Sequence, residues 1–283
     1  MLKQRVVTAI VLLAVLLPAL FASSAIPFTL LILAMMAAAS WEWGRLNGLG
    51  QVGSIVTALI CLLLCAFAWQ QGWIESQQPL LWVIVGGVWV LGSAALIRGG
   101  VESWGNIPQF MRLVVGVLAL WMAWLAVAQA RARGINFLLS IMMLVWVADI
   151  FAYFAGRAFG LKFTRNKLAP AISPGKSWEG AWGGIVGVLV LALIWVWADR
   201  QWQLVPPSFY SVLAQRGWWI LVVAALFMAA MSVVGDLIES LIKRSAGVKD
   251  SSHLLPGHGG VLDRIDALLP TLPLAMMLTS LVQ

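Results

Sequence analysis

A polar segment near the C-terminus carries most of the residues that could do chemistry. From Ser240 to Asp266 the chain reads SLIKRSAGVKDSSHLLPGHGGVLDRID, whereas the whole chain is 62% hydrophobic and only 10% charged. Charge at a bilayer boundary is costly, so this concentration indicates a functional site. The candidate catalytic residues are Asp236, Ser240, Lys243, Arg244, Lys249, Asp250, His258, Asp263, Arg264 and Asp266.

The spacing of the carboxylates predicts a metal site. Asp236, Ser240 and Lys243 share one face of a continuing helix, because they lie four and three residues apart. Asp263 and Asp266 share a face where the last apolar run begins, and glycines allow a sharp turn between the two helices. Three clustered carboxylates repel one another unless a cation holds them, and hard oxygen ligands suit Mg²⁺.

Basic residues beside these carboxylates predict phosphate binding. Lys243, Arg244 and Lys249 suit phosphate oxygens, and His258, next to two glycines, is a plausible phosphate donor. Carboxylates, cations and a flexible glycine loop are the groups needed for metal-assisted phosphoryl transfer. The alternative is that these charges are snorkelling residues and interhelical ion pairs. Their number favours a functional site.

A second polar segment, residues 149–180, contains a deep acid and a basic loop. Asp149, Tyr153 and Gly156 share one helix face, and an unpaired Asp149 would be costly in the membrane. Two interpretations stay open: loop charge with a structural Asp–Arg pair, or a surface for an anionic substrate or lipid headgroup. The basic residues are Arg157, Lys162, Arg165, Lys167 and Lys176.

The segment Ser173-Pro-Gly-Lys-Ser177 resembles a P-loop but fails its pattern. Position 170 is proline where the motif requires glycine, and no apolar strand precedes it. What remains is Lys176, Ser177 and Glu179 at the start of an apolar run, where a helix N-terminus favours anions. The small-residue face that follows, Gly180, Gly183, Gly184 and Gly187, is typical of close helix packing.

The composition predicts an all-α integral membrane protein, a polytopic bundle of about nine transmembrane helices. A soluble domain carries about 25% charged residues, and a span needs about 20 apolar ones. The net charge of +7 fits cytoplasmic loops near anionic lipid better than nucleic acid. The predicted spans are 5–22, 26–41, 53–70, 79–97, 112–129, 135–154, 179–198, 217–236 and 261–281.

Lysine and arginine positions predict the orientation. With a cytoplasmic N-terminus, 14 of the 18 basic residues lie on the cytoplasmic side, as do both polar segments. The first apolar run imitates a signal peptide, but we interpret it as an uncleaved span. Residues 1–130, where Glu42 is the exception among apolar spans, are predicted to be a scaffold, and residues 131–283 to carry the site.

The polar segments resemble the signature of the phosphatidate cytidylyltransferase (CDP-diacylglycerol synthase) family. The match runs without a gap through residues 240–266, and Ser177 stands where Thr is more usual in the family. The matching blocks are Ser240-x-x-Lys243-Arg244, Lys249-Asp250, Pro256-Gly-His258-Gly-Gly260 and Asp263-Arg264-x-Asp266. Further blocks are Gly235-Asp236, Asp149-x-x-x-Tyr153-x-x-Gly-Arg157, Lys167-Leu-Ala-Pro170 and Ser173-Pro-x-Lys176-Ser177-x-Glu179-Gly180.

The resemblance implies an enzyme that converts CTP and phosphatidate to CDP-diacylglycerol and pyrophosphate. It also implies dependence on Mg²⁺, a monovalent cation such as K⁺, a homodimer, and a bacterial inner membrane with the site facing the cytoplasm. Asp236, Asp263 and Asp266 would hold the metal. The substrate-binding residues would be Asp149, Tyr153, Arg157, Lys167, Ser173, Lys176, Ser177 and Glu179.

Two other functions would predict different sequence features. Another membrane phosphotransferase, such as a CDP-alcohol transferase, would carry a DGxxAR motif, which the chain lacks. A transporter would show inverted repeats and broken helices in both halves. The charges instead gather in one half of the sequence.

Overall fold

Long apolar runs form helices because a helix satisfies its own backbone hydrogen bonds away from water. The computed structural model describes residues 2–282. The helices are α1 (Leu2–Phe21), α2 (Ile26–Leu46), α3 (Gln51–Gln70), α4 (Pro79–Asn106), α5 (Gln109–Arg133), α6 (Ile135–Phe159), α7 (Trp178–Trp202), α8 (Phe209–Arg216), α9 (Trp218–Ser245), α10 (Leu262–Ile265) and α11 (Leu268–Val282). Between α6 and α7, strands β1 (Lys167–Ala169) and β2 (Ser173–Ser177) form an antiparallel hairpin.

The predicted polytopic helical architecture is confirmed. Within residues 2–282, nine helical stretches are long and apolar enough to cross a membrane, and α10 and α11 together form the last of them. Several predicted spans were too short at their C-terminal ends; α9, for example, continues to Ser245. Hydropathy marks only the apolar part of a helix, whereas backbone hydrogen bonding carries α9 on through polar residues. α4 reaches Asn106 across a kink, because the backbone of Gly100 is not helical.

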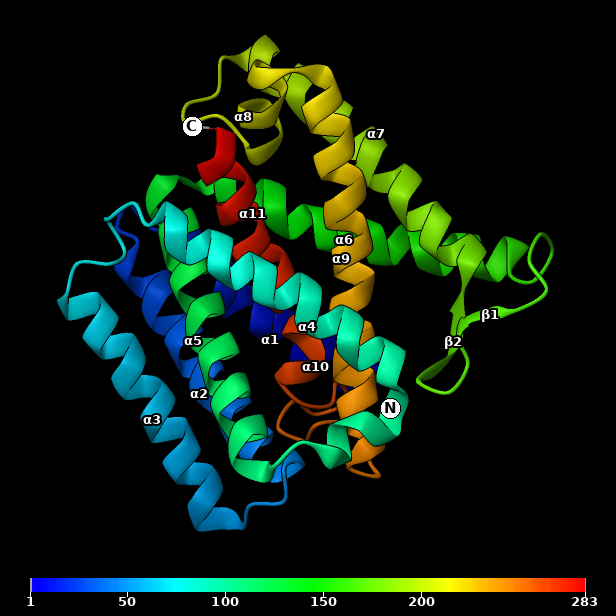
Figure 1. Ribbon diagram of the computed structural model, residues 1–283. Helices are drawn as coiled ribbons and strands as arrows, with labels where there is room; N and C mark the ends of the chain where they lie inside the picture. The colour runs from blue at the N-terminus through cyan, green and yellow to red at the C-terminus, as the bar shows by residue number, and fades with distance from the viewer. Residues whose placement is uncertain (1, 283) are drawn as a thin grey trace.

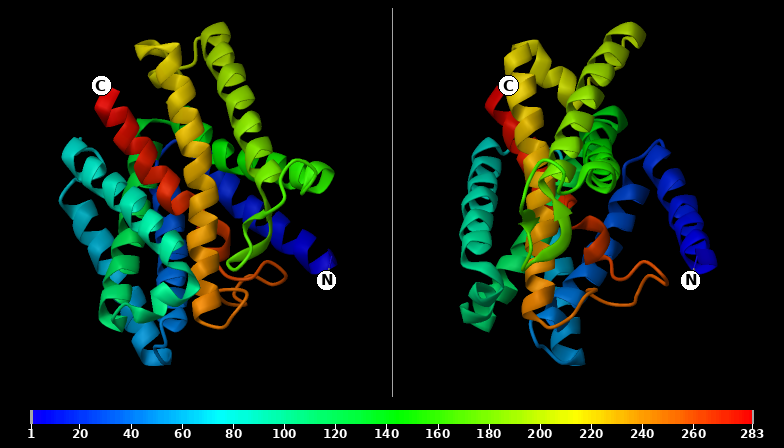
Figure 2. Two further views of the ribbon diagram at one scale, coloured as in Figure 1. Left: turned by 45° about the vertical axis from the view of Figure 1, so that its right-hand side comes forward. Right: turned by 90° about the vertical axis from the view of Figure 1, so that its right-hand side faces the viewer.

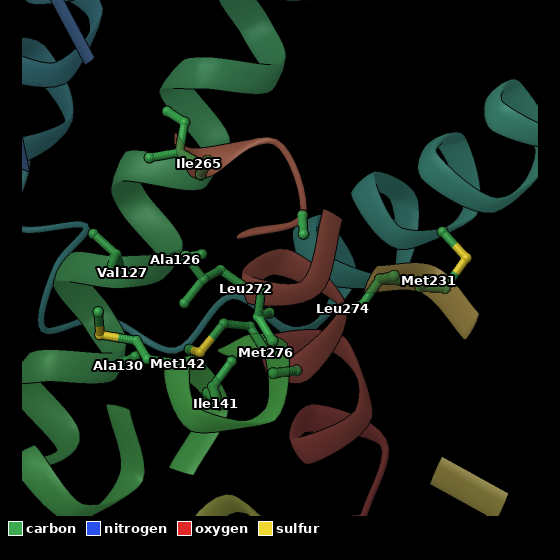
Figure 3. Packing of buried hydrophobic residues seen from close by; sticks show 14 of the residues in the cluster. Ala126, Val127, Ala130, Ile141, Met142, Met231, Ile265, Leu272, Leu274 and Met276 are labelled. Carbon is green, nitrogen blue, oxygen red and sulfur yellow. The ribbon is translucent and has the colours of Figure 1, made fainter. Parts of the chain in front are cut away.

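The last helix lies in the middle of the bundle. In Figure 1, α11 is seen among α4, α5, α6 and α9, and it packs against all four. Leu272 and Met276 of α11 belong to the same buried core as Ile141 and Met142 of α6 (Figure 3). Helices from the predicted scaffold therefore pack directly against helices from the predicted site region.

Turns between helices gather at two opposite ends of the bundle. At one end, Arg131 Nε donates to the Leu20 carbonyl over 3.1 Å, and Arg133 Nη1 donates to Thr279 Oγ1 over 3.2 Å. The C-terminus and α8 lie at this end (Figure 1). The turns after α2, α4 and α9 lie at the other end, where the polar C-terminal segment also lies.

The close pairing of α6 and α7 depends on glycine, as the sequence predicts. A Cβ atom on Gly184 would lie 2.8 Å from the carbonyl oxygen of Ala148, and one on Gly187 would lie 2.5 Å from the Phe151 ring. A side chain at either position would force the helices apart. The β1–β2 hairpin leaves this pair and lies beside α9 (Figure 2). The helix pair thus positions the second polar segment next to the first.

Candidate active site

Lys243 of α9 lies at the centre of a buried ionic cluster. Its Nζ is 2.5 Å from Asp263 Oδ1 and also contacts the carboxylate of Glu239, one helical turn earlier. The side chains of Lys243, Glu239 and Asp263 are only 11%, 8% and 4% exposed. Losing one partner of such a pair leaves an uncompensated buried charge, so the three groups depend on one another.

The second oxygen of Asp263 anchors the loop that precedes it. Asp263 Oδ2 accepts hydrogen bonds from Ser251 N at 2.9 Å, Ser251 Oγ at 2.9 Å and Gly260 N at 2.7 Å. Only glycine fits at position 260, because a Cβ atom on Gly260 would lie 2.0 Å from Ser251 Oγ and 2.4 Å from Glu42 Oε1. Asp263 therefore organises the loop as well as pairing with Lys243.

Glu42 of α2 holds the same loop from the predicted scaffold. Its side chain is fully buried and accepts hydrogen bonds from Ser251 Oγ at 3.2 Å and Ser252 Oγ at 2.5 Å. The backbone amides of Val261 and Leu262 also donate to it, at 2.9 and 2.8 Å. These amides begin the last span, where a carboxylate complements the helix N-terminus.

Glu42 is the site residue that the sequence reasoning missed. In the sequence it stands out only as the ionisable exception in the first spans, and no role is predicted for it. A single acid in an otherwise apolar run is itself a signal, because such a residue needs a partner. Which partner it has could not be read from the sequence, because its four donors lie more than 200 residues away.

Lys176 joins the two polar segments. Its Nζ, on strand β2, is 2.6 Å from Asp236 Oδ2 on α9, and the two side chains are 23% and 33% exposed. Ser240 Oγ donates to Asp236 Oδ1 over 3.2 Å, as the shared helix face predicts. The hairpin thus brings a cation to a carboxylate that is partly open to the surroundings.

Asp149 and Asp266 complete this open part of the site. Asp149 on α6 lies within electrostatic range of Asp236, Lys176 and Arg264, and Asp266 lies within range of Asp149 and Asp236. Four elements therefore contribute charges to one place: α6, β2, α9 and the start of the last span.

No ready-made metal cluster is present in the part of the chain that the structure describes. Among residues 2–282, no three His, Cys, Asp or Glu side chains lie close enough together to hold a metal ion. Asp263 pairs with Lys243 and anchors its loop, whereas Asp266 lies within electrostatic range of Asp236 and Asp149 as well as of Lys243. The sharing of one ion by Asp236, Asp263 and Asp266 stays a prediction.

A polar pocket of about 480 Å³ lies beside this cluster. The glycine-rich loop lines it with His258 and Arg264, and Arg5 of α1 completes it from the other end of the chain. Thr8 Oγ1 of α1 donates to the Pro256 carbonyl over 2.8 Å, which fastens α1 to the loop. His258 Nδ1 is buried and has no hydrogen-bond partner among the described residues. Lys249 and Asp250 also line this pocket.

Several predicted substrate residues make local contacts in this structure. Buried Glu179 accepts hydrogen bonds from the amides of Phe163 and Thr164, at 3.1 and 2.7 Å, and closes the loop after α6. Ser177 caps α7 by accepting from Gly180 N over 3.2 Å. These contacts order the segment that carries Lys176.

The remaining predicted residues lie on exposed or half-buried parts of the same end. Arg157 Nη1 lies 3.4 Å from Tyr153 Oη, and both residues are exposed on α6. Lys167 Nζ donates to the Pro174 carbonyl over 2.5 Å, within the hairpin that also contains half-buried Ser173. Arg244 Nη1 donates to the Val248 carbonyl over 3.2 Å and is exposed.

The apolar spans gather carboxylates and cations at one end of the bundle. This arrangement is typical of membrane-embedded enzymes that act on charged substrates. Comparison with known proteins makes this class more specific. A family model described as "Cytidylyltransferase family" matches residues 3–282. The chain belongs to this family and is a nucleotidyltransferase.

Curated bacterial relatives agree over almost the whole chain. Phosphatidate cytidylyltransferase of Pseudomonas aeruginosa is 37% identical, over 96% of this chain and 95% of its own length. The Haemophilus influenzae protein of the same name is 36% identical, over 96% of each chain. The Brucella abortus protein of that name is 33% identical, over 94% of this chain and 89% of its own.

Proposed function

We propose that the protein transfers CMP from CTP to phosphatidate, which gives CDP-diacylglycerol and pyrophosphate. The family match and the names of the three relatives support this assignment. The nine apolar helices suit an enzyme whose lipid substrate stays in the bilayer.

The observation that carries the proposal is the contact between Lys176 and Asp236. The two polar segments are 60 residues apart in sequence at this point, yet their side chains are 2.6 Å apart. The contact brings a cation of the second polar segment to a carboxylate beside the first. A reaction between two polyanions needs such an arrangement, because both substrates must be held against their mutual repulsion.

The reaction needs no strong general base. A phosphate monoester such as phosphatidate is already mostly ionised near neutral pH. One of its oxygens forms a bond to the α-phosphorus of CTP, and the bond from that phosphorus to the bridging oxygen of the leaving pyrophosphate breaks. Positioning and charge stabilisation then supply the catalysis.

The side chains of the site suit these tasks. Lys176, Lys243, Arg244 and Lys249 would hold the phosphates, with Arg264 in support. Ser240 and His258 would donate to phosphate oxygens, and the buried, unpartnered Nδ1 of His258 supports a polar role. Because Lys243 already pairs with Asp263, its second task would be to keep this carboxylate in place.

The carboxylates of the open part of the site suit a bound divalent cation. Asp149, Asp236 and Asp266 lie within electrostatic range of one another, with Lys176 and Arg264 as cations near them. Asp236, Asp263 and Asp266 would hold Mg²⁺, with a monovalent cation such as K⁺ nearby. The metal would supply charge neutralisation at the phosphates.

The proposal includes the surroundings of the enzyme. A bacterial inner membrane, a site on its cytoplasmic side and a homodimer remain expectations from the resemblance and from the positive-inside bias. The turns between helices lie at two opposite ends of the bundle, and the pocket lies at one of these ends. This arrangement supports a site that opens to one side of the membrane only.

The direct test is an assay of the purified protein in detergent micelles. Radiolabelled phosphatidate should be converted to CDP-diacylglycerol when CTP and Mg²⁺ are present, and EDTA should stop the conversion. Failure of the folded protein to convert phosphatidate with CTP would refute the proposed function.

Asp263→Asn tests the role of the central carboxylate. The variant keeps a side-chain oxygen for the amides of Ser251 and Gly260 but loses the charge that faces Lys243. We expect turnover to fall at least 100-fold, as is typical when an electrostatic group is removed, while the protein stays folded. Activity above about a tenth of wild type would contradict the metal role; the thermal midpoint serves as the folding control.

A further inference from the structure

A second pocket lies next to the glycine-rich one. Its volume is about 800 Å³, and its walls come from the ends of α2 and α4, the start of α5, and residues 245–253 after α9. Lys249, Asp250 and His253 line both pockets, so this segment forms the partition between them. About half of the residues that line the second pocket belong to the first 130 residues, which contribute no motif.

The charges that line the second pocket favour an anion. Arg45, Arg112 and Lys249 face it, with Asp250 as the acidic counterpart. The guanidinium carbon of Arg45 lies 4.9 Å from the centre of the Trp41 ring, a cation–π contact that fixes the side chain. Two positive charges are left over for a ligand, and arginine suits the oxygens of phosphate.

Unpartnered polar atoms point to the same kind of ligand. Trp104 is 3% exposed, and its indole Nε1 has no hydrogen-bond partner among the described residues; the same holds for Arg112 Nε. Asn47 is also 3% exposed, and its Oδ1 has no donor. Native proteins satisfy about nine in ten buried polar atoms, so three orphans around one pocket need an explanation.

The wall that carries these atoms is already ordered. Gln109 Nε2 donates to the Asn47 carbonyl over 2.8 Å, and Trp43 Nε1 donates to the Arg112 carbonyl over 3.1 Å. The rings of Trp43 and Trp104 meet edge to face, with centroids 5.6 Å apart. These contacts hold α2, α4 and α5 together, so little ordering is needed when a ligand binds.

We propose that this pocket binds a phosphate ester, at a site separate from the catalytic cluster. Arg45 and Arg112 would hold the phosphate, and the Trp104 N–H would donate to one of its oxygens. Asn47 Oδ1 would accept from a hydroxyl on the alcohol part. The volume suits a ligand larger than inorganic phosphate. The ester is either the headgroup of an anionic phospholipid or a free soluble ester.

Binding to the full-length, detergent-solubilised protein in EDTA tests the proposal without measuring activity. The probes are phosphatidylglycerol as the anionic lipid, phosphatidylcholine as its zwitterionic control, and glycerol 3-phosphate and CMP as free esters. We expect Arg112→Gln and Trp104→Phe each to weaken binding at least tenfold, either of phosphatidylglycerol or of the free esters. Arg98→Gln is the matched control, because Arg98 is an exposed arginine of α4 that lines neither pocket; it should change binding less than twofold.

The pattern of losses identifies the source of the ester. A loss confined to phosphatidylglycerol assigns the pocket to a lipid headgroup, and a loss confined to glycerol 3-phosphate or CMP assigns it to a soluble ester. The proposal is overturned if no probe binds. It is also overturned if Arg112→Gln and Arg98→Gln weaken binding equally, because the effect is then general surface charge. Thermal midpoints within a few degrees of wild type show that the variants are folded.

Discussion

At the scale of single residues, two carboxylates divide the work of holding the glycine-rich loop. Asp263 accepts hydrogen bonds from Ser251 and Gly260, and Glu42 accepts from Ser251, Ser252 and two amides at the start of the last span. Ser251 Oγ contacts both carboxylates and connects them. The loop is thus fastened from inside the apolar bundle, although it lies at one end of it.

Glu42→Gln should weaken this attachment. One side-chain oxygen becomes an NH₂ group, which then faces the amide of Val261 or Leu262, and neither amide can turn away. Leaving a buried donor unpaired costs about 1–3 kcal/mol. We expect a lower thermal midpoint and turnover reduced about tenfold or more, since Asp263 shifts with the loop.

The matched control for this prediction is Glu102→Gln, at an exposed position of α4. The Glu102→Gln substitution removes the same charge but does not disturb a buried hydrogen bond. A Glu42→Gln protein with wild-type turnover and thermal midpoint would show that the carboxylate does not hold the loop.

At the scale of elements, a partly exposed ion pair docks the β1–β2 hairpin on α9. The hairpin is joined to α6 and α7 and touches α9 through Lys176 and Asp236, whose side chains are partly exposed. Such a surface ion pair is worth about 0–1 kcal/mol. The contact is strong enough to bias the position of the hairpin and weak enough to be exchanged for a substrate phosphate.

Lys176→Met should loosen the hairpin without unfolding the bundle. Loss of up to about 1 kcal/mol corresponds to amide exchange up to about fivefold faster in residues 165–177, measured by mass spectrometry. The thermal midpoint should stay within about 2 °C of wild type. Arg165→Met, at an exposed position of the same connection, is the control and should leave exchange unchanged. Equal exchange in the two variants would show that the ion pair does not dock the hairpin.

At the scale of the whole molecule, the long apolar helices place the hairpin and the glycine-rich loop at one end. The C-terminus and the connection between α3 and α4 lie at the other (Figure 1). The arginine and lysine bias predicts that the first end faces the cytoplasm. The two native cysteines, Cys61 and Cys65, are buried, so single introduced cysteines can report on either end.

Cysteine labelling in intact cells tests this orientation. Asn166→Cys in the hairpin should resist a membrane-impermeant maleimide until the membrane is opened, whereas Gln77→Cys between α3 and α4 should react at once. Both positions are exposed, so burial does not explain a difference. The reverse pattern would place the site outside the cytoplasm. The unaltered protein, whose cysteines are buried, is the control for background labelling.

The sequence by itself determined the membrane-spanning helices and predicted which polar segments carry the site. Apolar runs decide where a chain crosses a membrane, because each span must exclude charge and satisfy its own backbone. The type and spacing of residues 236–266 likewise indicated phosphate chemistry, and the family comparison agrees. Both properties are local: they depend on which residues stand near one another along the chain.

Only the tertiary structure decided which charges meet. Spacing predicted that Asp263 and Asp266 share a helix face, but not their partners: Asp263 pairs with Lys243, and Asp266 lies within electrostatic range of Lys243, Asp149 and Asp236. Glu42 reaches its loop across 209 residues of sequence. A buried carboxylate takes whatever donors the packing of helices brings to it. That packing depends on side-chain shapes throughout the bundle, which no local pattern records.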